Sequence, residues 1–89
     1  MIKKNVKIKN KLGLHARAAV KFVNLANRFS SSIKIKKDSN EVDGKSVLGI
    51  LTLAAVQGSE IQLKVAGKDE KMALQAINDL IDDKFHEKE

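Results

Sequence analysis

The segment IQLKVAGKDEKMALQAINDLI, Ile61–Ile81, contains two successive patterns that together decide the class of fold. In its first part apolar and polar residues alternate, which predicts a strand buried only on the face of Ile61, Leu63 and Val65. In its second part the apolar residues recur with the period of a helix, and Asp69 is the expected N-terminal cap. The buried stripe of this helix comprises Ala73, Ala76, Ile77, Leu80 and Ile81. A strand with one buried face followed at once by an amphipathic helix indicates an α+β protein.

Three further segments show the alternation of a strand. They cover residues 2–9, 33–36 and 41–43, and the last two should form a hairpin around the turn at 38–40. Every predicted strand is apolar on one face only. We therefore expect an antiparallel sheet with helices on one side and water on the other.

Two further helices are predicted. The first begins near Ala16 and ends near Arg28 or Phe29, with a polar stripe opposite its apolar face. The second is short, apolar on nearly every side, and follows Ser46, which is a reasonable N-cap. The chain contains no linker, repeat or low-complexity tract, so we expect residues 1–89 to form a single domain.

The last six residues, KFHEKE, read as a polar tail. Chain ends of this composition usually fray, so we expect no regular structure there. His86 lies in this tail with no glycine turn before it and no helix after it, and we interpret it as a solvated residue.

The composition narrows the classes of function. The 89 residues carry a formal net charge of +6 and include no cysteine, which excludes disulfides and thiolate metal sites. A single internal histidine does not provide the set of ligands that a metal site needs, so we expect no metal and no cofactor. The longest apolar run, Val47–Val56, is about half the length that a membrane span needs. The N-terminus also lacks the apolar stretch of a signal peptide, and we expect a cytoplasmic protein without membrane insertion.

The main candidate for chemistry is the histidine in LGLHARAA, Leu12–Ala19. His15 stands between the flexible turn at Gly13 and the start of a helix, where the first backbone N–H groups have no internal partner and attract anions. Arg17 adds a fixed positive charge in the same turn. This pattern fits a histidine that accepts a phosphoryl group, and it equally fits a histidine that merely caps the helix. No P-loop is present, so a phosphoryl donor would be another protein or a small phosphorylated compound.

Three segments together resemble the HPr family, the histidine-containing phosphocarriers of the bacterial phosphoenolpyruvate-dependent phosphotransferase system. They are LGLHARAA, then DGKSVLGILTLAA at 43–55, then GKDEKMALQAI at 67–77. The resemblance covers nearly the whole chain. It implies an open-faced β-sandwich, in which a four-stranded antiparallel sheet is covered on one face by three helices, and this agrees with the order of elements predicted above.

The resemblance also implies a function. In this family enzyme I, itself phosphorylated by phosphoenolpyruvate, passes the phosphoryl group to the histidine, and the carrier hands it to enzyme IIA domains. Matched position by position, His15 is the phosphoacceptor, through its Nδ1 atom, and Arg17 stabilises the phosphohistidine. Such a protein carries a phosphoryl group for sugar uptake and is not a stand-alone catalyst. We expect it to be a monomer.

Two further assignments follow from the same resemblance. Ser46 matches the regulatory serine that HPr kinase/phosphorylase modifies in many bacteria, although a plain helix cap remains an alternative. A phosphate there would repel an acidic partner.

Partner docking in this family uses the first two helices, and we expect Val47 and Leu48 to be the more exposed residues of the matching set. The matching residues are Ala16, Val20, Val47, Leu48 and Leu51.

The sequence leaves two other functions open. The protein could belong to the nitrogen-related regulatory branch of the phosphotransferase system, which the sequence does not separate from the sugar branch. It could also be a small basic nucleic-acid-binding module. However, its lysines are spread along the chain, and without tryptophan or tyrosine no stacking platform for bases is visible. A lysine-rich surface also suits an acidic protein partner.

Overall fold

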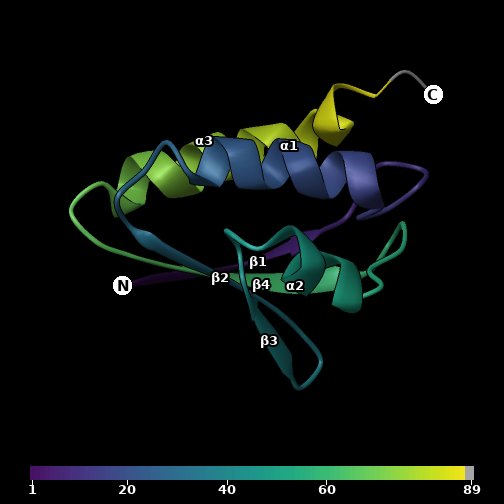
Figure 1. The fold of residues 1–89 in the computed structure, drawn as a ribbon, viewed down its shortest axis with the longest axis horizontal. Coiled ribbons are helices and arrows are strands. Elements are labelled where there is room, and N and C mark those ends of the chain that lie inside the picture. The colour runs from purple at the N-terminus through teal and green to yellow at the C-terminus, as the bar shows by residue number, and fades with distance from the viewer. Residues whose placement is uncertain (88–89) are drawn as a thin grey trace.

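The computed structural model describes residues 1–87 and consists of a four-stranded antiparallel sheet with helices packed on one face (Figure 1). The elements, in chain order, are β1 (Ile2–Lys7), α1 (Ala16–Ala26), β2 (Ser32–Lys37), β3 (Asn40–Asp43), α2 (Val47–Thr52), β4 (Glu60–Ala66), α3 (Glu70–Asp82) and the 3₁₀ turn η1 (Lys84–His86). The strands lie in the order β1-β4-β2-β3, and all three pairings are antiparallel. The expected α+β open-faced sandwich is therefore confirmed.

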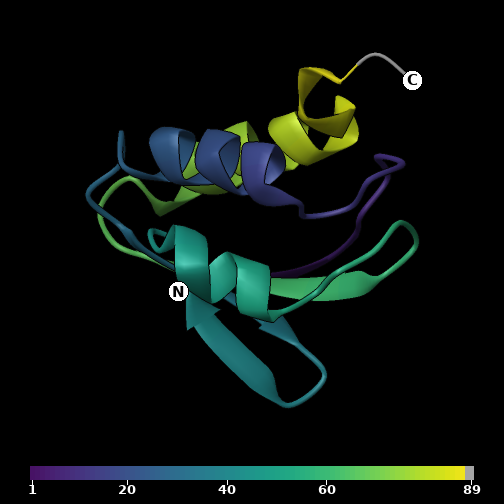
Figure 2. The same cartoon turned by 45° about the vertical axis from the view of Figure 1, so that its right-hand side comes forward.

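The register of the sheet aligns the apolar face that the alternation predicted. In the central strand β4, Leu63 pairs with Ile35, and Val65 lies between Ile33 and Ile2. Figures 1 and 2 show α1 and α3 above this face, where they pack against each other. Their buried residues include Phe22 of α1 and Ile77 of α3. The core is thus a single layer between the sheet and the helices, and α2 closes one side of it beside β3 and α1.

The first helix ends earlier than the apolar pattern suggested. Its last residue is Ala26, and the N–H groups of Arg28 and Phe29 donate to carbonyls three residues back, at Leu25 and Ala26. The final turn therefore tightens into 3₁₀ geometry, a common way to end a helix without orphaned carbonyls. Phe29 still packs against the core from this turn, which explains why it looked helical in sequence.

Asp69 precedes α3 as predicted, but its side chain does not cap that helix. Its carboxylate instead accepts hydrogen bonds from the hydroxyl and the backbone N–H of Ser31, and from the backbone N–H of Ser30. These bonds, the Ser31 hydroxyl first, lower the pKa of Asp69 to about 2. The residue therefore ties the connector after α1 to the start of α3. The carboxylate of Glu70 reaches back to the N–H of Gly67, 3.2 Å away.

The expectation of a frayed tail is wrong for residues 84–87. Lys84, Phe85 and His86 turn through three successive left-handed conformations, with φ of 54°, 55° and 59°. Such conformations cost roughly 1–2 kcal/mol per non-glycine residue. The fully buried Phe85 offsets part of that cost, since burying a phenylalanine contributes about 1.5–3 kcal/mol. His86 is exposed, as predicted, and its Nδ1 pairs with the carboxylate of Asp83.

Candidate functional site

His15 is the N-cap residue of α1, and a tight turn sets its position. Gly13 adopts φ +68°, and its N–H donates to the carbonyl of Asn10 at 3.1 Å. The next residue, Leu14, donates its N–H to the carbonyl of Ala55 at 2.9 Å. A Cβ at position 13 would approach that same carbonyl to 2.4 Å. Glycine is therefore required both by the left-handed backbone and by the close approach of the segment that follows α2.

The N-terminal end of α1 is open to an anion. The side chain of His15 makes no capping hydrogen bond, and the first turn of the helix contains no acidic residue. The N–H groups of the first turn have no partner within the helix, and the helix dipole adds partial positive charge there. This combination is a recurring binding site for phosphate groups.

The imidazole of His15 is held by a carboxylate that sequence reasoning did not place there. Its Nε2 lies 2.5 Å from Oε2 of Glu87, and its side chain retains 26% of its exposure. The Nδ2 group of Asn10 donates to Oε1 of Glu87 and to the carbonyl of Gly13, both at 2.7 Å. Burial raises the pKa of Glu87, but the hydrogen bonds from Asn10 and His15 outweigh it and leave the pKa below its usual value. Glu87 is therefore an ionised acceptor at neutral pH.

Arg17 lies in the first turn of α1, one residue beyond the start of the helix. It is exposed and forms no ion pair with any of residues 1–87. Its guanidinium therefore has no ion-pair partner within these residues, and its role at His15 stays a prediction. Arginine suits this position because its planar fork of donors matches the oxygens of a phosphoryl group.

Ser46 caps α2, as predicted. Its Oγ accepts a hydrogen bond from the N–H of Gly49 at 3.0 Å, and the residue is partly exposed. Next to it, the side chain of Lys45 donates to the carbonyl of Phe29 at 2.8 Å, which ties the start of α2 to the turn that follows α1.

The five residues matched to partner docking lie on α1 and α2, two helices that pack against each other. Leu48 is 77% exposed, and Ala16 and Val20 are also exposed. Val47 was expected among the most exposed, but it is half-buried, because it packs on the core at the start of α2. Leu51 is half-buried in the same way. We call these five residues, Ala16, Val20, Val47, Leu48 and Leu51, the predicted docking surface, in short the docking surface.

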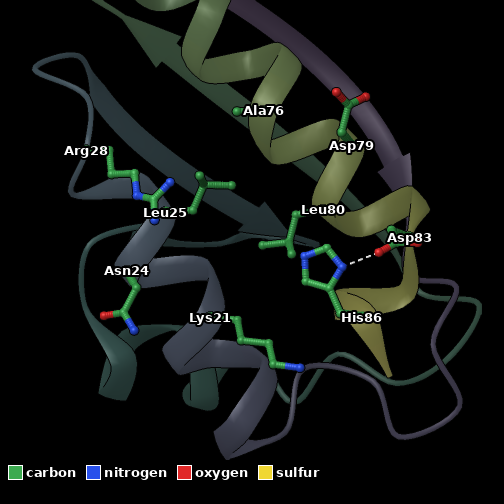
Figure 3. Close-up of a pocket in the computed structure, with 9 residues that line it drawn as sticks. All are labelled: Lys21, Asn24, Leu25, Arg28, Ala76, Asp79, Leu80, Asp83 and His86. Atoms are coloured by element: carbon green, nitrogen blue, oxygen red, sulfur yellow. Dashed lines mark hydrogen bonds and ion pairs between the residues drawn. The ribbon is translucent and has the colours of Figure 1, made fainter. Parts of the chain in front are cut away.

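A separate groove of about 550 Å³ runs between α1 and α3, beside η1 (Figure 3). Its floor is apolar, with Leu25 and Leu80, and its rim is charged, with Lys21, Arg28 and Asp83. Neither His15 nor Arg17 lines it.

Within residues 1–87 there is no cluster of three or more acidic or histidine side chains suited to a metal ion. No helix in that range has the length and apolarity to span a membrane.

The fold and the site define a small open-faced α+β protein that presents a histidine and an arginine at one helix start. The family model described as PTS HPr component phosphorylation site matches residues 2–83. The phosphocarrier protein HPr of Neisseria meningitidis serogroup A is 45% identical over 89 residues, covering 100% of both chains. The chain belongs to the HPr family of phosphocarriers in the phosphotransferase system.

Solved structures agree with this assignment. The crystal structure of HPr-C-His from Thermoanaerobacter tengcongensis superposes with a TM-score of 0.95, at 45% identity and with 100% of both chains covered. A second structure from that organism, described as an HPr dimer, has a TM-score of 0.79 at 46% identity, covering 98% of this chain and 100% of that one.

Proposed function

We propose that this chain accepts a phosphoryl group on His15 from phosphorylated enzyme I and passes it to enzyme IIA domains for sugar uptake. The observation that carries the proposal is the partly exposed imidazole at an open helix start that holds no acidic residue. A site of this kind stabilises an incoming anion, and phosphoryl transfer depends mainly on positioning and on charge stabilisation. A partner that brings the phosphoryl group needs little else from a carrier of this size.

The roles within the site follow from the charges. The phosphoryl group would bond to Nδ1 of His15, the ring nitrogen that Glu87 does not contact. Arg17, which has no ion-pair partner among residues 1–87, would bind the phosphoryl oxygens. This arrangement supports a carrier with a phosphohistidine intermediate in preference to a stand-alone catalyst.

Enzyme I and the enzyme IIA domains would bind at the docking surface. Its exposed apolar residues, Val20 and Leu48, lie on the two helices next to the site. A small patch of this kind suits transient complexes, because a large apolar interface would slow release between the two transfers. We further propose that the carrier acts as a monomer in the cytoplasm, and light scattering on the purified protein tests the monomeric state.

Regulation through Ser46 is the second part of the proposal. A phosphate on its hydroxyl would add negative charge beside Leu48, at the edge of the docking surface. An acidic partner would then be repelled. The competing interpretation is that Ser46 acts only as the cap of α2, and treatment with HPr kinase/phosphorylase followed by mass spectrometry distinguishes the two.

The test of the carrier function is incubation with enzyme I and labelled phosphoenolpyruvate, followed by mapping of the modified residue. We expect one acid-labile phosphoryl group on His15, and no label on a His15→Ala variant that remains folded. The matched control is His86→Ala, which removes the other histidine and should still accept the label. Label retained by His15→Ala, or lost from His86→Ala, would contradict the proposal.

The nitrogen-related branch would use the same chemistry at His15. Rates of phosphorylation by enzyme I of each branch, measured side by side, separate the two pathways.

The nucleic-acid alternative has one feature in its favour, because Lys3, Lys64 and Lys34 are in register across the outer face of the sheet. However, Lys64 pairs with Glu41 at 2.8 Å, and a titration at low salt that finds no binding removes this alternative.

A further inference from the structure

The contact between Glu87 and His15 is built by several residues and is not an isolated surface pair. The Glu87 side chain retains only 11% of its exposure, and its two oxygens have separate donors. Oε2 faces Nε2 of His15 at 2.5 Å, and Oε1 accepts from Asn10 at 2.7 Å. Asn10 is itself fully buried and also bonds the carbonyl of Gly13, in the turn that sets the position of His15. Each oxygen of the Glu87 carboxylate is therefore held by its own hydrogen-bond donor, which fixes the orientation of the group.

The C-terminal segment adopts an unfavourable backbone in order to reach this position. Three non-glycine residues in succession, Lys84 to His86, have left-handed φ values, an arrangement that costs energy at each residue. The segment is anchored by the buried ring of Phe85 and by Lys21, whose ammonium group donates to the carbonyl of Phe85 at 2.6 Å. The next residue along the chain is Glu87. Strain held by such anchors commonly marks a position with a function.

An ionised carboxylate has no hydrogen to donate, so Nε2 of His15 must be the donor in this contact. In a neutral ring the hydrogen then resides on Nε2, and Nδ1 carries the lone pair. We propose that Glu87 is a positioning residue for phosphoryl transfer: it holds the hydrogen of His15 on Nε2, so that Nδ1 faces an incoming phosphoryl group as the nucleophile. This inference rests on the proposed function of His15. Carboxylates that fix the tautomer of a reacting or metal-bound histidine act by the same principle.

The transfer step balances with Glu87 in this role. The lone pair of Nδ1 forms a bond to phosphorus, and the bond from phosphorus to the phosphorylated donor protein breaks, with its electron pair remaining on the donor. The hydrogen stays on Nε2, so the phosphorylated ring is positively charged. Glu87 lies on the opposite side of the ring from the phosphoryl group and compensates that charge. The reverse transfer to an acceptor protein uses the same arrangement.

The competing interpretation is that the Glu87 carboxylate occupies the anion site and inhibits the carrier. The two interpretations predict opposite effects of removing it. A positioning residue speeds transfer, so its removal slows the reaction, whereas the removal of an inhibitory anion accelerates it. We favour positioning because the carboxylate bonds Nε2 and Asn10, and no hydrogen bond links it to the N–H groups of the first turn of α1 within residues 1–87.

The test compares the full chain with Glu87→Ala and Glu87→Gln. The glutamine is nearly isosteric but can donate an N–H to Nε2, which permits the wrong tautomer. Glu60→Ala, an exposed carboxylate in β4, is the charge-matched control. Nitrogen NMR of labelled histidine measures the hydrogen on each ring nitrogen of His15, and rapid quenching measures the rate of labelling by phosphorylated enzyme I. Dispersed amide spectra check that each variant is folded.

We expect the wild type and Glu60→Ala to carry the hydrogen on Nε2 and to be labelled at equal rates. Glu87→Gln should show more of the Nδ1–H tautomer, and both Glu87 variants should be labelled about tenfold more slowly, as expected for the loss of one charge-assisted hydrogen bond. Unchanged ring signals and rates, or faster labelling, would overturn the inference and leave the carrier function standing. Absence of label on wild-type His15 would overturn both, while the ring signals would still report whether the contact exists.

Discussion

The carboxylate of Glu87 lies 2.5 Å from Nε2 of His15, although the two residues are 72 positions apart in the chain. This contact connects the C-terminal segment with the start of α1. It means that the candidate site is assembled from three parts of the chain: the turn at Gly13, the first turn of α1 and the segment after α3. Asn10 bonds both the turn and Glu87, but substitutions at Gly13, in the first turn of α1 and in η1 still alter each part separately.

The turn before His15 depends on glycine for two reasons that substitution can separate. Gly13→Ala introduces both an unfavourable φ of +68° and a clash with the carbonyl of Ala55. Gly58→Ala introduces an unfavourable φ of +87° with no atom nearby, so it serves as the matched control. We expect Gly58→Ala to lower the free energy of unfolding by about 1 kcal/mol. Gly13→Ala should lower it by about 2 kcal/mol or more and should also slow labelling of His15. Equal losses in denaturant titrations would contradict this account.

A glycine in the left-handed turn of η1 should lower the energetic cost of its backbone conformation. His86 is exposed with φ of 59°, and both His86→Gly and His86→Ala remove its pair with Asp83. Only glycine adopts this conformation without a Cβ penalty. His86→Gly should therefore be more stable than His86→Ala by about 1 kcal/mol in chemical denaturation. If alanine proves as stable as glycine, the turn is not held in the left-handed region in solution.

Substitutions can also separate the capping role of Ser46 from the effect of a negative charge at that position. Ser46→Ala should lower the free energy of unfolding by about 1 kcal/mol, because the N–H of Gly49 loses its acceptor. Ser46→Asp retains an acceptor and should cost less, but it should raise the KM for phosphorylation by enzyme I through its negative charge. Ser32→Asp, on the exposed start of β2, is the charge-matched control and should leave that KM unchanged. Equal KM values for the two aspartate variants would remove Ser46 from the docking region.

Leu48 should contribute to partner binding and hardly at all to folding. It is 77% exposed on α2, so Leu48→Ala should change the free energy of unfolding by less than about 0.5 kcal/mol. Binding to enzyme I, measured by calorimetry, should weaken by about tenfold if Leu48 is a central contact. Val56→Ala removes another exposed apolar side chain, outside the docking surface, and should bind normally. Normal binding by Leu48→Ala would exclude α2 from the interface.

Acid should weaken the fold through Asp69. Its pKa is lowered to about 2 by the hydrogen bonds from Ser31 and Ser30, whereas an aspartate in the unfolded chain has a pKa of about 3.9. The folded state therefore binds the proton less readily, so this contribution to stability is complete above about pH 4 and is lost as the pH falls toward 2. The melting temperature of the wild type should fall more steeply over this range than that of Asp69→Asn. Asp38→Asn, in the exposed turn after β2, should follow the wild type.

The sheet and the three helices were predictable because their signals are local and periodic. Alternation in β4 fixed which side chains, such as Leu63 and Val65, face the core, and a shift of one residue would have exposed all of them. The position of His15 was also predictable, since a glycine turn followed by helical spacing marks a helix start. The family resemblance then supplied the proposed roles of Arg17 and Ser46, which periodicity alone does not contain.

The contact of Glu87 with His15 was not predictable from local patterns. It requires a run of left-handed conformations that no side-chain propensity favours, and tertiary anchoring decides it. The one signal in the sequence was Phe85, a large apolar residue inside a charged segment. The interpretation of the tail as frayed overlooked this residue. The use of Asp69 as a tie to Ser31, in place of a helix cap, likewise depends on the spatial proximity of two distant connectors.

The central claim is that His15 carries the phosphoryl group on Nδ1 while Nε2 remains bonded to Glu87. The most direct measurement is phosphorus–nitrogen coupling in the NMR spectrum of the protein labelled with ¹⁵N-histidine and phosphorylated by enzyme I. The account predicts a coupling between phosphorus and Nδ1 of His15, with a hydrogen retained on Nε2. Phosphorus bonded to Nε2, or to any residue other than His15, would contradict it.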